Sequence, residues 1–107
     1  MFDFKVDIYE NDKNNNKKVS LYVFRSNELN ISYITNTNKC TFSFNLEYIT
    51  INEANNQIEK FGSYLDFDYK ELVYHPLDYN VICYINKKET NESILESICE
   101  CFHIKID

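Results

Sequence analysis

The residue types best suited to metal chemistry lie near the C-terminal end of the chain, at Cys99, Cys101 and His103, with Cys83 as a fourth candidate ligand. Thiolates and an imidazole suit Zn²⁺, which takes four such ligands in a tetrahedron. Structural zinc sites, however, use ligand pairs about two to four residues apart on turns. Residues 99 and 101 on a helix instead point about 200° apart. We therefore expect Cys83 and Cys101 to be core residues and Cys99 to be partly exposed, with no metal and no cofactor.

Residues for acid–base or nucleophilic catalysis are few. His75 and His103 are the two histidines, and neither lies in a recognisable Cys/His or Ser/His motif. The single glycine, Gly62, excludes the glycine-rich loops that close around phosphates. Asp66 and Asp68 can pair as carboxylates on one strand face, but such a pair is more typical of a solvated surface. We expect no enzyme. The alternative is a small metal-binding or hydrolytic protein that uses Cys83, Cys99, Cys101 and His103.

The chain is acidic, and its charge is unevenly distributed. The net charge is −6. Residues 1–52 hold six acidic and six basic residues, whereas residues 53–107 hold eleven acidic residues and five lysines. A negative surface repels phosphate backbones and anionic membranes, so we expect no direct contact with nucleic acid or membrane. The electrostatically favoured partner is a basic protein.

Length and composition predict one globular domain that spans residues 1–107 and works in the cytoplasm. The chain is 44% hydrophobic and 26% charged, which is typical of a folded domain. No apolar run approaches the ~20 residues that cross a bilayer, and the alternation of residues 1–4 does not fit a signal peptide. The four cysteines are therefore expected to be reduced.

Four strands are expected in the first half of the chain. Residues 40–51 alternate most clearly, with Phe42, Phe44, Leu46 and Tyr48 on the side expected to face a core. The other three strands are expected at residues 2–9, 19–24 and 29–33. The polar connections are short, which predicts an antiparallel meander.

The second half of the chain is expected to add two short helices. Asn52 is expected to cap the first, with Gly62 in a left-handed conformation at its end. Thr90 or Asn91 is expected to cap the second. Residues 63–74 fit a strand or a helix, and their alternation favours the strand. Residues 81–86 predict a central strand, and residues 103–106 fit a final edge strand. The predicted class is α+β: a mainly antiparallel sheet with a four-stranded N-terminal meander, one to three further strands and two short helices packed on it.

The stretch most suggestive of function runs from residue 64 to residue 79. It combines tyrosines, which give large contact area at low entropic cost, with acids that steer a basic partner. The predicted partner-binding residues are Tyr64, Asp66, Asp68, Tyr69, Glu71, Tyr74, Asp78 and Tyr79. A second candidate surface, at four-residue spacing, comprises Glu92, Glu96 and Glu100.

In size, charge and lack of catalytic residues the chain resembles the broad group of small acidic inhibitors. This group includes immunity proteins that neutralise toxin nucleases and phage proteins that block host defence. No motif is specific enough to name a family. The resemblance implies a protein that binds and inhibits a basic partner, such as a toxin or a nucleic-acid-processing enzyme. The alternative is a structural module that self-associates through a sheet edge or an exposed aromatic face, for example as a homodimer.

Overall fold

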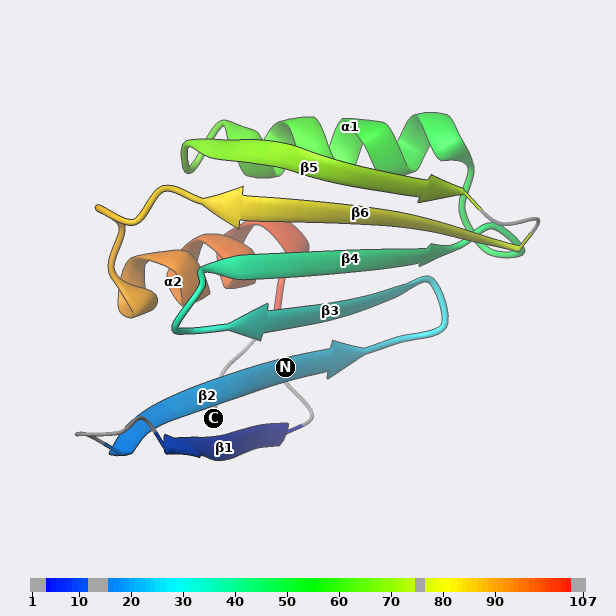
Figure 1. Cartoon of the computed structure of the whole chain (residues 1–107). Helices are drawn as coiled ribbons and strands as arrows, with labels where there is room; N and C mark the ends of the chain where they lie inside the picture. The colour runs from blue at the N-terminus through cyan, green and yellow to red at the C-terminus, as the bar shows by residue number, and fades with distance from the viewer. Residues whose placement is uncertain (1–3, 12–15, 75–76, 105–107) are drawn as a thin grey trace.

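The computed structural model describes residues 4–11, 16–74 and 77–104, and for residues 4–11, 16–18 and 68–74 it describes the backbone alone. The elements follow in this order: strands β1 (Phe4–Asn11), β2 (Asn16–Arg25), β3 (Leu29–Ile34) and β4 (Lys39–Asn45), helix α1 (Ile51–Gly62), strands β5 (Phe67–Tyr74) and β6 (Asp78–Ile85), and helix α2 (Asn91–Phe102) (Figure 1). The α+β class, the order of the N-terminal meander and the two helices are as predicted.

The strands form one antiparallel sheet in the order β1-β2-β3-β4-β6-β5. β6 lies between β4 and β5, so β5 is an edge strand and β4 joins the N-terminal meander to the β5–β6 hairpin. Both helices pack against the same face of this sheet, and they contact each other (Figure 1). The opposite face carries no helix among the described elements.

The core lies between the sheet and the two helices. Alternate residues of β4 are fully buried, at Cys40, Phe42 and Phe44. The ring of Phe42 packs against Phe61 of α1 at 5.2 Å and against Phe102 of α2 at 5.4 Å between ring centres. These rings hold both helices on one strand, and truncating such a buried ring costs about 3–5 kcal/mol.

The fourth strand ends earlier than its alternation predicts. β4 stops at Asn45, whose carbonyl accepts from the amides of Tyr48 and Ile49, while its side chain accepts from Glu47 N. Residues 46–49 therefore form a turn. Tyr48, which the alternation placed in the core, is 58% exposed.

Helix α1 begins two residues earlier than expected and ends differently. Its N-cap is Thr50 rather than Asn52, with the Thr50 side chain accepting from Glu53 N at 3.2 Å. Gly62 is the last helical residue and has no positive φ, and Ser63 caps the helix in an ordinary right-handed conformation. A Cβ on Gly62 would lie 2.9 Å from Phe67 Cε1. The glycine is therefore required by close packing and not by a left-handed backbone.

The C-terminal half otherwise follows the predicted elements closely. Residues 67–74 form a strand, with a register shift between Tyr69 and Glu71. Thr90 caps α2, and His103 ends it in the left-handed conformation, so the strand expected from residue 103 does not begin there. Residues 105 and 106 lie outside the described residues. Neither described helix is long and apolar enough to cross a membrane.

Candidate partner-binding surface

The predicted partner-binding residues follow the β5–β6 hairpin along its whole length. Tyr64 and Asp66 precede β5 at one end, and Asp78 begins β6 at the other, where Tyr74 pairs with Tyr79. Asp68, Tyr69, Glu71 and Tyr74 lie between these ends on the edge strand. Their side chains are outside the described residues, so their contribution stays a prediction. The hairpin therefore has two ends that can be compared.

Tyr79 lies on the face of β6 that the helices cover. It is 9% exposed, and its ring stacks on Phe44 at 6.3 Å between centres. Its hydroxyl donates to Asn55 Oδ1 of α1 at 2.7 Å. A buried hydroxyl needs such an acceptor, and the bond joins β6 to α1. Tyr79 is therefore a core residue and not part of the partner-binding surface, to which the sequence pattern assigned it.

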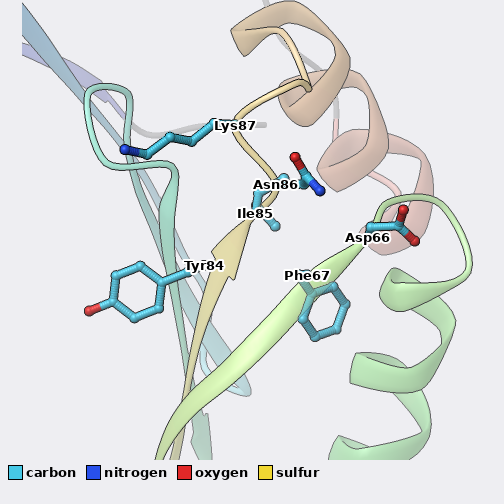
Figure 2. Close-up of a pocket in the computed structure, with 6 residues that line it drawn as sticks. All are labelled: Asp66, Phe67, Tyr84, Ile85, Asn86 and Lys87. Carbon is cyan, nitrogen blue, oxygen red and sulfur yellow. The ribbon is translucent and has the colours of Figure 1, made fainter.

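At the end of the hairpin where β5 begins, the acid is balanced by lysines. Asp66 Oδ2 lies 3.5 Å from Lys88 Nζ, and both side chains are largely exposed. A hollow of about 460 Å³ adjoins this pair, lined by Asp66, Phe67, Tyr84, Ile85, Asn86 and Lys87. Figure 2 shows Tyr84 and Lys87 on one side of the strand ends, with Asp66 and Phe67 on the other. The hollow follows the strand ends, and the opposite charges of Asp66 and Lys87 nearly cancel.

At the other end of the hairpin, exposed apolar side chains adjoin exposed acids. The backbone amide of Leu46 donates to Leu77 O at 2.9 Å, so the turn after β4 lies beside the start of β6. Tyr48 is 58% and Leu77 57% exposed. Their sequence neighbours on this surface are exposed acids. We call Glu47, Tyr48, Leu77 and Asp78 the turn-end surface.

Sequence reasoning missed three of these four residues as surface candidates, Glu47, Tyr48 and Leu77, and for Tyr48 one local signal identifies the error. Tyr48 was assigned to the core because the alternation of β4 continues through it. Thr50 and Glu53, however, have the spacing of a capping box, which places the helix start at Ile51. A helix that starts there leaves residues 46–49 no room to continue the strand. Leu77 carries no comparable signal in the sequence.

Helix α2 presents a second acidic surface. Glu92, Glu96 and Glu100 are all exposed, and the helix has no basic residue. Among the described residues no ion pair engages them. Glu92 is favourable near the positive end of the helix dipole, but Glu100 lies at the negative end, and like charges four residues apart repel. This surface lowers the stability of α2 and has no compensating base in the described chain.

The four cysteines and His103 lie in different surroundings in the described part of the chain. Cys83 is fully buried on β6, opposite Cys40, and Cys101 Sγ donates to Gln57 O at 3.8 Å. Burial raises the pKa of Cys83 to about 12 and of Cys101 to about 11, which disfavours the nucleophilic thiolate. Cys101 and His103 line a hollow of about 280 Å³, yet no three metal-ligating side chains converge among the described residues.

No family model, no curated protein and no solved structure matches the chain.

Proposed function

We propose that this protein is a stoichiometric inhibitor, which binds a basic protein partner in the cytoplasm and has no catalytic activity of its own. The partner is a toxin or a nucleic-acid-processing enzyme, whose groove for phosphates is basic. The chain covers that groove, and inhibition is steric and electrostatic. The β5–β6 hairpin with its flanking turns is the contact region, through Tyr64, Asp66, Asp68, Tyr69, Glu71, Tyr74 and Asp78.

One observation carries this proposal. Among the side chains that the structure describes, three large apolar ones are exposed: Tyr48, Tyr64 and Leu77. Each lies within two residues of an exposed acid, and all three lie at the ends of the same hairpin. Protein interfaces combine apolar anchors with charged residues at the rim, and acids at the rim select a basic partner.

The test is capture with tagged protein from the native lysate, washed at low and at high salt. We expect one basic protein at a one-to-one ratio, lost at high salt because salt screens the attraction. Adding the purified chain to that protein should abolish its enzymatic activity at one equivalent. Failure to capture a basic protein, or full activity of the captured protein when saturated with the chain, contradicts the proposal.

A second candidate function is self-association. The sheet face away from the helices is uncovered among the described elements, and it carries half-buried aliphatic side chains at Leu21, Val23, Ile34 and Ile82. Sedimentation at micromolar concentration separates the two functions, since an inhibitor need not dimerise. The bulge in β5 does not favour pairing of two edge strands, because bulges interrupt the ladder at sheet edges.

A further inference from the structure

We propose that the turn-end surface, Glu47, Tyr48, Leu77 and Asp78, is the docking centre for the partner. It takes a protein segment in which arginine or lysine residues flank an apolar side chain. This inference rests on the proposed function. It assigns the binding to one end of the hairpin and adds three residues, Glu47, Tyr48 and Leu77, to the predicted set.

The backbone of the turn-end surface is held in place before any partner arrives. Asn45 pairs with Asp78 across β4 and β6, and the Leu46 amide donates to Leu77 O at 2.9 Å. Within the turn, Asn45 O accepts from Tyr48 N at 3.0 Å, and Asn45 Oδ1 accepts from Glu47 N at 3.0 Å. These bonds fix the positions of all four residues, so binding does not have to order the backbone.

The two apolar side chains of this surface are not needed by the core. Ile49, the next residue after Tyr48, is 5% exposed and fills the space under the turn. Tyr48 and Leu77 remain more than half exposed, and they are the two most exposed large apolar side chains in the described part of the chain. Apolar area in water is unfavourable, so a partner that covers these two side chains gains binding free energy.

The charge around this surface determines the kind of partner. Residues 40–59 and 71–86, which supply this surface, contain no lysine or arginine. The end of β2 and the turn after it, which carry Arg25 and Glu28, also lie beside it, because Asn45 N donates to Glu28 O at 2.8 Å. Glu47 and Asp78 therefore face no base from their own segments, in contrast to Asp66, which pairs with Lys88. A basic segment fits this surface, and a guanidinium can in addition stack on the exposed Tyr48 ring.

The probe for this surface is an acetylated and amidated eight-residue peptide that alternates arginine and leucine. It is titrated into ¹⁵N-labelled protein, and a peptide with glutamate in place of arginine is the control. We expect saturable amide shifts centred on residues 46–49 and 77–78 with the basic peptide and none with the acidic one. Shifts centred on β5 or on α2, or shifts that do not saturate, overturn the docking centre.

A matched pair of variants sharpens the result. The double variant Tyr48→Ser with Leu77→Ser removes both exposed apolar groups. The control, Asn36→Ala with Thr37→Ala, changes two exposed residues of the turn before β4, at the opposite end of this strand and outside the proposed contact region. We expect the double variant to bind the peptide about tenfold more weakly, with the control variant unchanged. Unchanged ¹⁵N spectra outside the mutated sites show that both variants are folded.

Capture from the lysate distinguishes this inference from the proposed function. If wild type and the double variant capture the same basic protein equally, the docking centre is wrong and the inhibitor function stands. If only the wild type and the variant Asn36→Ala with Thr37→Ala capture it, both stand. If no form captures a basic protein, the proposed function fails, and the peptide titration alone decides whether the surface has the stated chemistry.

Discussion

Replacing Gly62 with alanine tests why the chain has its one glycine at the end of α1. The substitution places a Cβ 2.9 Å from Phe67 Cε1 and 3.2 Å from Phe67 Cζ. Carbon atoms pack best at about 3.5–4.0 Å, so the Phe67 ring must move. Its ring stacks on Phe61 at 5.6 Å, and Phe61 is fully buried, so the ring can shift only toward solvent.

The magnitude follows from two opposed effects. Overpacking of this kind costs about 1–3 kcal/mol, and the half-buried position of Phe67 favours the lower part of that range, about 1.5 kcal/mol. Alanine is better than glycine inside a helix by about 1 kcal/mol, and roughly half of this applies at the last helical residue. We therefore expect Gly62→Ala to lower the free energy of unfolding by about 1 kcal/mol and Tm by about 4 °C.

Urea unfolding followed by far-UV circular dichroism measures this change, with Phe67→Ala as the matched background. Without the ring, Gly62→Ala should stabilise the chain by about 0.5 kcal/mol, because only the helix propensity remains. The sign of the effect thus reverses between the two backgrounds. Equal effects in both backgrounds, or stabilisation of the wild-type chain, would refute the packing explanation.

Three further predictions concern the core, the acidic helix and the thiols. Tyr33→Phe removes the buried hydroxyl that donates to Asn91 Oδ1 at 2.7 Å, and chemical denaturation should show a loss of about 1 kcal/mol; an unchanged midpoint would contradict the bond's role. Glu96→Gln removes two like-charge pairs on α2 and should stabilise the chain by about 0.5 kcal/mol at low salt but not at 1 M salt; equal effects at both salts would exclude charge repulsion. Burial raises the pKa of Cys83 and Cys101 in the folded state, so these thiols ionise at lower pH in the unfolded chain. The free energy of unfolding should therefore fall as pH rises from about 9 toward 11. Replacing both cysteines with alanine should weaken this pH dependence, and an unaltered pH profile would contradict the role of the two thiols.

The sequence predicts the sheet well because alternation in β3 and β4 is strict up to the point where each strand ends. It predicts the end of β4 poorly, since apolar residues continue at even spacing through Leu46 and Tyr48. The termination depends on Asn45 and Thr50, whose side chains accept from backbone amides. A short local hydrogen bond here outweighs the hydrophobic pattern.

The candidate surface was harder to predict than the fold. Tyr79 resembles its neighbours Tyr64 and Tyr74 in sequence, and only the packing of α1 against β6 shows that it is buried. The lysines that balance Asp66 come from a turn more than twenty residues further along the chain. Leu77 is likewise exposed at a place where two segments distant in sequence meet, the turn after β4 and the start of β6. These features arise from tertiary contacts that a linear pattern does not contain.

The central claim, that this chain inhibits a basic partner by covering it, is tested most directly by titrating the purified chain against the protein it captures. The account predicts that activity falls linearly to zero at one equivalent at low salt, and that the double variant Tyr48→Ser with Leu77→Ser needs about tenfold more protein. Undiminished activity at a large excess of the wild-type chain would contradict it.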